Sequence, residues 1–236
     1  MSLAKLKKEL RSLANPEKAK VYQRFFKTGK GHYGEGDIFL GITVPEQRKI
    51  AKKFYKNLTL QDIQKLLSSK IHEERFTALE ALNFMYEKNV SERKNIFDFY
   101  LDNTSRINNW DLVDTSAPYI LGEYLFNRNK SILLKLSKSQ NLWEKRISII
   151  ATFYFIKHSR FEETLKIAEI LMNDKHDLIH KAVGWMLREV GNKNLFVEEN
   201  FLKKHYKKMP RTMLRYAIEK FDDEKRKMYL RGKISV

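Results

Sequence analysis

Apolar positions recur at the spacing of amphipathic helices over most of this chain. Three segments show the pattern most clearly: EERFTALEALNFMYEK (73–88), LWEKRISIIATFYFIK (142–157) and HKAVGWMLREVG (180–191). Apolar residues at i, i+3, i+4 and i+7 indicate helices, and the chain has no alternating run typical of a half-buried strand. Five of its nine glycines lie together in GKGHYGEGDIFLG (29–41), which we interpret as a structural joint. The pattern predicts an all-α fold.

The predicted helices also repeat. A basic residue followed by apolar residues recurs at Arg75, Arg146, Lys181 and Arg215, with spacings of 71, 35 and 34 residues. The first spacing is about two periods, and a period of this length is typical of the two-helix unit of an α-solenoid. We therefore predict a single domain over 1–236, an α-solenoid of HEAT-like antiparallel helix pairs with a concave basic face. The alternatives are an irregular helical bundle and, for the basic residues, solvated charges at helix starts.

The charge of the chain narrows the class of partner. Its formal net charge is +17 at pH 7, which indicates a polyanionic partner. Nucleic acid is the first candidate and an anionic membrane surface the second. No run of 18 apolar residues is present, so we expect no segment that spans a bilayer. The absence of cysteine excludes disulfides and cysteine nucleophiles and fits a reducing compartment, so we expect a cytoplasmic protein.

The segment RINNWDLVDTSAPYILGEYL (106–125) interrupts the basic repeat. The midpoint of the 71-residue spacing falls at Trp110 and Asp111, where the repeat would place a cation. On an ideal helix Asp114 lies about 40° from Trp110, at the border of an apolar stripe, and the two can contact the same ligand. Asp111 lies about 100° away from Trp110 and is expected to face solvent.

A proline lies in the middle of the same segment. Pro118 cannot donate a backbone hydrogen bond and crowds the carbonyl of residue 114, so the helix should kink or restart there. In the plainer interpretation, Asp114 or Ser116 caps a second helix that starts near Pro118, and Trp110 belongs to the core.

A second tryptophan lies in the segment 180–191. Lys181, Trp185 and Arg188 share one helix face at i, i+4 and i+7, and aromatic faces beside cations suit a phosphate backbone. Gly184 costs about 1 kcal/mol against alanine inside a helix, which a close backbone approach would explain.

Five ordered motifs together resemble the AlkD-type DNA alkylation repair family. They are YGEGDIFLGITVPEQRKIAKKF, NWDLVDTSAPYILGEYL, LWEKRISIIATFYFIK, HKAVGWMLREVGNKN and MPRTMLRYAIEKF, and the likeness extends from about residue 15 to 231. The resemblance implies a HEAT-like-repeat DNA glycosylase that acts in base excision repair. Its substrates would be alkylated purines, notably 3-methyladenine and 7-methylguanine, hydrolysed at the N-glycosidic bond while the lesion stays stacked.

The resemblance also implies roles for individual residues. The catalytic carboxylate of the family matches Asp114, and the two tryptophans that cradle the lesion match Trp110 and Trp185. The arginine that contacts DNA near the site matches Arg146. With the repeat, this gives the expected DNA-binding residues Arg146, Lys181, Arg188, Arg75 and Arg215.

The remaining expectations concern what else the protein needs. We predict a monofunctional hydrolase without cofactor or metal, because His176 and His180 lack a third ligand and no lysine stands out as a Schiff-base former. We expect a monomer without an obligate protein partner. A non-catalytic HEAT-like-repeat protein that binds unusual or branched DNA is the main alternative, and a scaffold for an acidic protein is the other.

Overall fold

The computed structural model describes residues 2–234, and the regular elements of this part of the chain are all helices, without a strand. The all-α prediction is confirmed. Only an isolated parallel bridge between Ile38 and Ile71 adds sheet-like pairing there. Within the described residues, no helix has the length and apolar character needed to cross a membrane. The chain divides into two compact units, Met1–Ser116 and Ala117–Val236, and the single domain over 1–236 stays a prediction.

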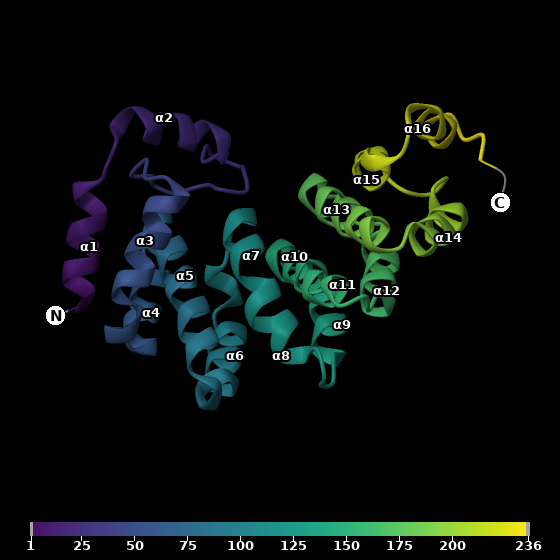
Figure 1. The fold of residues 1–236 in the computed structure, drawn as a ribbon. Helices are drawn as coiled ribbons and strands as arrows, with labels where there is room; N and C mark the ends of the chain where they lie inside the picture. Colours follow the sequence, from purple (N-terminus) through teal and green to yellow (C-terminus); the bar gives the residue numbers. More distant parts are fainter. Residues whose placement is uncertain (1, 235–236) are drawn as a thin grey trace. The chain divides into compact units, whose positions relative to one another are not determined.

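Unit 1 contains the helices from α1 to α7 (Figure 1). Its elements are α1 (Ser2–Ser12), α2 (Pro16–Phe25), α3 (Val44–Phe54), η1 (Tyr55–Asn57), α4 (Leu60–Leu67), α5 (His72–Lys88), η2 (Val90–Glu92), α6 (Arg93–Asp102), η3 (Thr104–Arg106) and α7 (Trp110–Ala117). Helices α3 and α4 both pack against α5, which forms the centre of this unit.

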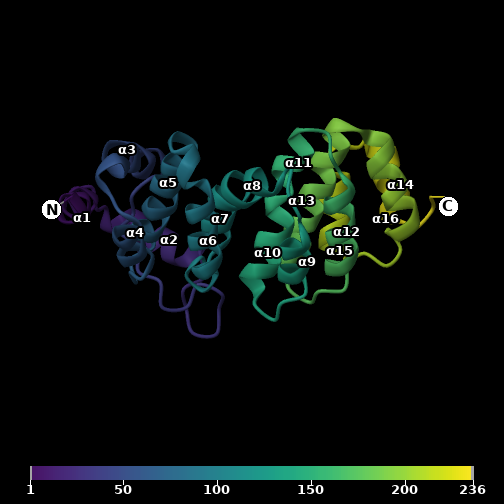
Figure 2. The same cartoon turned by 90° about the horizontal axis from the view of Figure 1, so that it is seen from below.

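Unit 2 begins at the last residue of α7 and holds the remaining helices. Its elements are η4 (Pro118–Gly122), α8 (Glu123–Leu125), α9 (Ser131–Ser137), α10 (Leu142–Ala151), α11 (Phe153–Lys157), α12 (Glu162–Leu171), α13 (Asp177–Lys193), α14 (Leu195–His205), α15 (Arg211–Ala217), η5 (Ile218–Lys220) and α16 (Asp223–Leu230). Helix α9 lies beside α10 (Figure 2), and α13 packs against α10, α12, α14 and α15.

Each helix thus packs mainly on its neighbours in sequence, which is the solenoid-like arrangement that the repeat predicted. The repeat also has a structural register. Arg146, Lys181 and Arg215 are each the fifth residue of their helix, and Arg75 is the fourth of α5. In α7 the fifth residue is Asp114, so an acid occupies the position that carries a cation in the other four helices. The concave basic face stays a prediction.

Side-chain caps fix where many helices begin. Asn15 accepts a hydrogen bond from the backbone N–H of Lys18 at 3.0 Å, and Pro16 fills the first position of α2. The same kind of cap recurs at Thr59, Asn141, His176, Asn194 and Asp222. Each such cap stabilises its helix by about 1 kcal/mol, because it satisfies a backbone donor that has no partner inside the helix.

Two glycines in unit 2 allow helices to approach closely. A Cβ at Gly184 would lie 2.4 Å from the carbonyl oxygen of Met213 in α15, and one at Gly122 would lie 2.3 Å from that of Ala151 in α10. Any larger residue would separate these helices. The close approach expected at Gly184 is therefore present, and it is made by the protein's own backbone.

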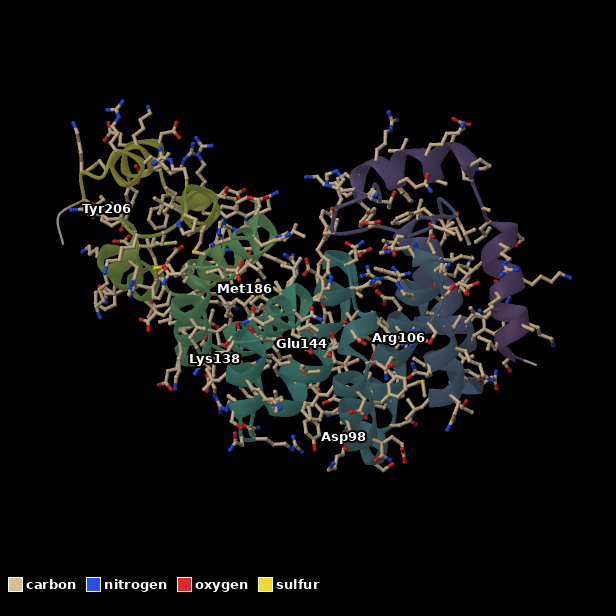
Figure 3. All side chains as sticks on the ribbon, turned by 180° about the vertical axis from the view of Figure 1, so that it is seen from behind. Asp98, Arg106, Lys138, Glu144, Met186 and Tyr206 are labelled. Atoms are coloured by element: carbon tan, nitrogen blue, oxygen red, sulfur yellow. The ribbon has the colours of Figure 1, made fainter. Side chains whose placement is uncertain are left out.

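The cores of the units consist mainly of aliphatic and aromatic residues, and most charged residues lie at the surface. Met186 of α13 is fully buried among the helices of unit 2, whereas Asp98 of α6 lies on the outside of unit 1 (Figure 3). The helix interrupted by Pro118 continues as one wide turn, η4, which has a π-helical hydrogen-bond pattern. The predicted disruption at Pro118 is confirmed. Ser116 does not cap a second helix, because its hydroxyl donates to the carbonyl of Leu112 at 2.6 Å.

Candidate functional site

The first turn of α7 is held by short side-chain hydrogen bonds. The backbone N–H of Trp110 donates to Oδ1 of Asn109 at 2.8 Å, and Asn109 is fully buried. The backbone N–H of Leu112 donates to Oδ1 of Asp111 at 2.9 Å. These bonds satisfy donors that a helix start leaves without intrahelical partners, so the helix begins at a fixed residue.

Trp110 is half-buried against aromatic rings of the α2 segment. Its ring stacks on Phe26, with centroids 5.2 Å apart and planes at 12°, and meets Phe25 edge-on at 5.9 Å. Phe25 is itself 62% exposed. The indole is therefore not an ordinary core residue: one side is supported by α2, and part of its surface remains accessible.

Asp114 follows Trp110 by one helical turn and is also half-buried. Its charge acts on Tyr100, whose pKa is raised first by burial and further by the nearby carboxylate of Asp114. The predicted pair of tryptophan and carboxylate thus lies along one helix face at i and i+4. Asp114 lies inside α7 rather than before a second helix, so the capping interpretation does not describe it.

Asp111 corrects one of our expectations. Its side chain is only 14% exposed and accepts a hydrogen bond from Nε2 of His72 at 2.7 Å, so it does not face solvent. The other ring nitrogen of His72 lies 3.1 Å from Oδ2 of Asp37, which also accepts from Nη2 of Arg75 at 2.6 Å. Asp37 belongs to the glycine-rich segment 29–41, so this segment is tied to α5 and α7 through buried ion pairs.

The glycine-rich segment binds an internal carboxylate rather than an external phosphate. The backbone N–H groups of Leu40 and Gly41 donate to the Glu73 carboxylate at 2.8–3.0 Å, and Glu73 is 1% exposed. Gly41 has a positive φ of 83°, and a Cβ there would lie 2.2 Å from the carbonyl oxygen of Asn15. The segment is a structural joint.

Two of the five expected DNA-binding cations are buried. Arg75 is 4% exposed, and besides Asp37 it donates to the carbonyl of Ser69 at 2.9 Å. Arg146 is 5% exposed and donates to the carbonyl of Leu178, the second residue of α13, at 2.7 Å. Both guanidinium groups join neighbouring segments, so their burial does not support a surface contact with DNA. Replacing either residue is expected to destabilise the fold, whereas replacing an exposed basic residue would not.

The second tryptophan is positioned by a carboxylate. Nε1–H of Trp185 donates to Oε1 of Glu189 at 3.0 Å, and the Phe153 ring lies 5.8 Å from the indole. Arg188 also contacts Glu189 at 3.3 Å and forms a second ion pair with Glu219. Because two carboxylates neutralise its charge, Arg188 is better placed to orient Glu189 than to bind a phosphate.

The remaining two expected cations lie at the surface of unit 2. Lys181 is paired with Asp177 at 2.7 Å across one turn of α13, and its side chain is 40% exposed. Arg215 is exposed on α15. An exposed pair such as Lys181 with Asp177 stabilises by less than about 1 kcal/mol, so the ammonium can exchange this partner for a phosphate.

A further basic surface was missed in the sequence. Lys20, Arg24 and Lys27 are exposed and, with His32, line an open hollow of about 710 Å³. Lys20 and Arg24, at i and i+4, share one face of α2, and this spacing was visible in the sequence. Lys27 follows two residues after the helix ends. The same helix ends at Phe25, which contacts Trp110. The cations therefore lie within about one turn of the pair formed by Phe25 and Trp110.

Comparison with known proteins places the chain among related sequences and folds. The family model described as DNA alkylation repair enzyme matches residues 6–221. Among solved structures, a predicted DNA alkylation repair enzyme from Enterococcus faecalis superposes with a TM-score of 0.69 at 18% identity, covering 89% of this chain and 97% of that chain. At this identity the structural likeness shows the fold alone. No curated protein matches the chain.

Proposed function

Because the chain belongs to the DNA alkylation repair enzyme family, we propose that it is a monofunctional DNA glycosylase for cationic alkylated purines. Its substrates would be 3-methyladenine and 7-methylguanine in duplex DNA, and it would start base excision repair by releasing the damaged base. The enzyme would act as a monomer without a cofactor.

One observation carries this proposal. Asp114 places a carboxylate one helical turn from the half-exposed ring of Trp110, at the helix position where the other repeats carry a cation. A protein of net charge +17 that only bound DNA would gain nothing from a carboxylate facing phosphates. Catalysis of glycosidic bond cleavage, in contrast, requires a negative group beside the sugar.

The chemistry follows from the charge of the substrate. Alkylation at N3 or N7 makes the purine cationic, so the C1′–N bond can break with its electron pair passing to the base, without a general acid. The sugar then develops oxocarbenium character, which the Asp114 carboxylate stabilises electrostatically. Water attacks C1′ and loses a proton to solvent or to the carboxylate, leaving an abasic site and a neutral base. The indole of Trp110 would stabilise the cation and exclude water, and the family resemblance assigns a similar role to Trp185.

The direct test is excision of 7-methylguanine from a duplex that contains a single such base, followed by mild alkali to cleave abasic sites. At about 4 Å and an effective dielectric of about 20, one carboxylate stabilises a developing cation by roughly 4 kcal/mol. Asp114→Asn should therefore slow excision by about 10³-fold, with undamaged-duplex affinity unchanged or slightly higher.

Asp102→Asn is the matched control, because Asp102 is an exposed carboxylate at the end of α6 in the same unit. It should excise at the wild-type rate. Excision by Asp114→Asn at the wild-type rate would contradict the proposed catalytic role of the carboxylate.

The second candidate is a non-catalytic DNA-binding protein with the same fold. The exposed cations Lys20, Arg24 and Lys27 favour duplex binding in either case. If wild-type protein binds duplex DNA with a strong salt dependence but releases no base, this candidate replaces the glycosylase.

A further inference from the structure

We propose that His72 is a positioning residue: bridging Asp37 and Asp111, it fixes the first turn of α7 and thereby orients Trp110 and Asp114. The inference rests on the proposed function, because the orientation matters for the same carboxylate and indole. It assigns a task to Asp111, the other aspartate of α7, which is held by His72.

The hydrogen-bond geometry determines the protonation of His72. Its Nε2 and Nδ1 lie 2.7 Å and 3.1 Å from carboxylate oxygens of Asp111 and Asp37. An ionised carboxylate only accepts hydrogen bonds, so both ring nitrogens must carry hydrogen and the imidazole is cationic. Burial alone lowers the pKa of His72, but the charge and hydrogen bond of Asp111, together with Asp37, outweigh it and raise the pKa to about 9.

The buried charges balance one another. Two carboxylates, Asp37 and Asp111, face two cations, His72 and Arg75, and the four groups come from the glycine-rich segment, α7 and α5. Arg75 opposes the protonation of His72, and the amide of Asn109 also reaches Asp37, at 3.5 Å. Buried ion pairs of this kind stabilise one arrangement strongly, since removing one member leaves an uncompensated charge.

Glu73 also lies next to His72, at the start of α5, but its carboxylate is already occupied by backbone N–H groups of Leu40 and Gly41. It therefore does not compete with Asp111 for the imidazole. Of the two aspartates in the first five residues of α7, the nearer to the helix start is neutralised internally by His72. The proposed catalytic role then falls to Asp114.

An aromatic column links the imidazole to Trp110. The His72 ring stacks on Phe39 at 4.5 Å and lies 5.1 Å from the ring of Phe26, which in turn stacks on Trp110. A cavity of about 350 Å³ opens beside these rings and is also lined by Asp111. Because this space would let the rings move, packing alone does not hold the column. The bond between His72 and Asp111 does.

The matched variants are Asp111→Asn and His72→Asn, measured in single-turnover excision of 7-methylguanine. Misplacing a catalytic group by about 1 Å costs about 10²-fold, so each should lower the excision rate by about that factor. Affinity for undamaged duplex should stay within about twofold. If His72 acts through Asp111, the double variant should lose no more than the worse single variant, because the two share one interaction. Asp102→Asn again serves as the control.

A pH profile tests the same contact without any substitution. The folded pKa of His72 is above its ordinary value of 6.5, so its stabilising contribution is complete at low pH and is lost as the pH rises through about 9. Wild-type excision should fall above about pH 9, and Asp111→Asn should lack this fall. An unchanged high-pH limb in Asp111→Asn would contradict the proposal, as would wild-type excision rates in both folded single variants.

Tryptophan emission separates this proposal from the glycosylase itself. In a Trp143→Phe/Trp185→Phe background only Trp110 emits, and its spectrum should change near pH 9 and on Asp111→Asn. If the wild type shows no excision while the emission of Trp110 responds in this way, the proposed function fails and the positioning role of His72 stands. If excision is normal and Trp110 does not respond, the positioning fails alone. A variant that does not fold, as judged by circular dichroism, leaves the wild-type pH titration of Trp110 to decide.

Discussion

The two tryptophan helices, α7 in unit 1 and α13 in unit 2, hold their indoles by different means. Trp110 stacks on Phe26, and the carboxylate next to it in sequence is neutralised by a buried imidazolium. Trp185 instead donates its N–H to Glu189, which is paired with the partly exposed Arg188. The first indole is fixed by its face and the second by its edge.

This difference decides how each region responds to conditions. The ion pairs around Asp111 are 2–14% exposed and are screened little by salt, whereas Glu219, which pairs with Arg188, is 52% exposed. We expect the orientation of Trp110 to depend on pH and that of Trp185 to depend on ionic strength. The proposed catalytic carboxylate, Asp114, therefore lies in the region that is held by buried ion pairs. A catalytic group needs such a rigid support.

The largest expected effect in this comparison is loss of either indole. Trp110→Ala and Trp185→Ala should each slow excision of 7-methylguanine by up to about 30-fold, since a desolvated cation–π contact contributes about 2 kcal/mol. Affinity for undamaged duplex should change less. Phe196→Ala removes an aromatic side chain that is 73% exposed on α14 and should leave both measurements unchanged. Loss of thermal stability without a selective loss of excision would show that both tryptophans are structural core residues only.

A smaller effect is expected from the cations at the end of α2 and just after it. Arg24→Ala/Lys27→Ala should reduce the slope of log affinity against log salt by about 1.8, because each phosphate that is no longer neutralised lowers the slope by roughly 0.9. Lys52→Ala/Lys56→Ala removes the same charge from exposed positions around the end of α3 and is the matched control. Equal changes of slope in the two double variants would show that only net charge matters, and that α2 does not bind the duplex directly.

Local pattern was sufficient for much of this molecule. The helices, the disruption at Pro118 and the close approach at Gly184 all follow from properties of single segments: apolar spacing, a missing donor and a missing side chain. The face shared by Trp110 and Asp114 follows from helix geometry alone. These features need no knowledge of what packs against the segment.

Long-range partners set the limit of the sequence interpretation. Asp111 was expected to face solvent because a helical projection cannot show His72, which lies 39 residues earlier. Arg75 was expected at the DNA surface because nothing local reveals Asp37, its partner 38 residues before it. In both cases an ionisable side chain is buried only because a distant segment supplies the opposite charge.

The smallest expected effect comes from the buried carboxylates of the two units, whose pKa values shift in opposite directions. Burial would raise the pKa of Asp37 in unit 1, but His72 and Arg75 hold it below its usual range. Glu198 in unit 2 is 1% exposed beside Gly191, its Oε1 has no hydrogen bond among the described residues, and burial together with Glu199 raises its pKa to about 8. A carboxyl with a raised folded pKa stabilises the fold below its unfolded value of 4.5, and this contribution is lost as the pH rises through about 8.

Glu198→Gln removes that ionisation and should leave excision unchanged. Its melting temperature should match the wild type near pH 4 and exceed it by several degrees at pH 9, since each kcal/mol shifts Tm by about 2–4 °C in a chain of this size. Glu224→Gln, an exposed carboxylate on α16, should shift Tm little at either pH. If the difference between Glu198→Gln and the wild type were the same at pH 4 and pH 9, Glu198 would ionise normally. Unit 2 would then hold a compensated charge, as unit 1 does, and the contrast between the two units would disappear.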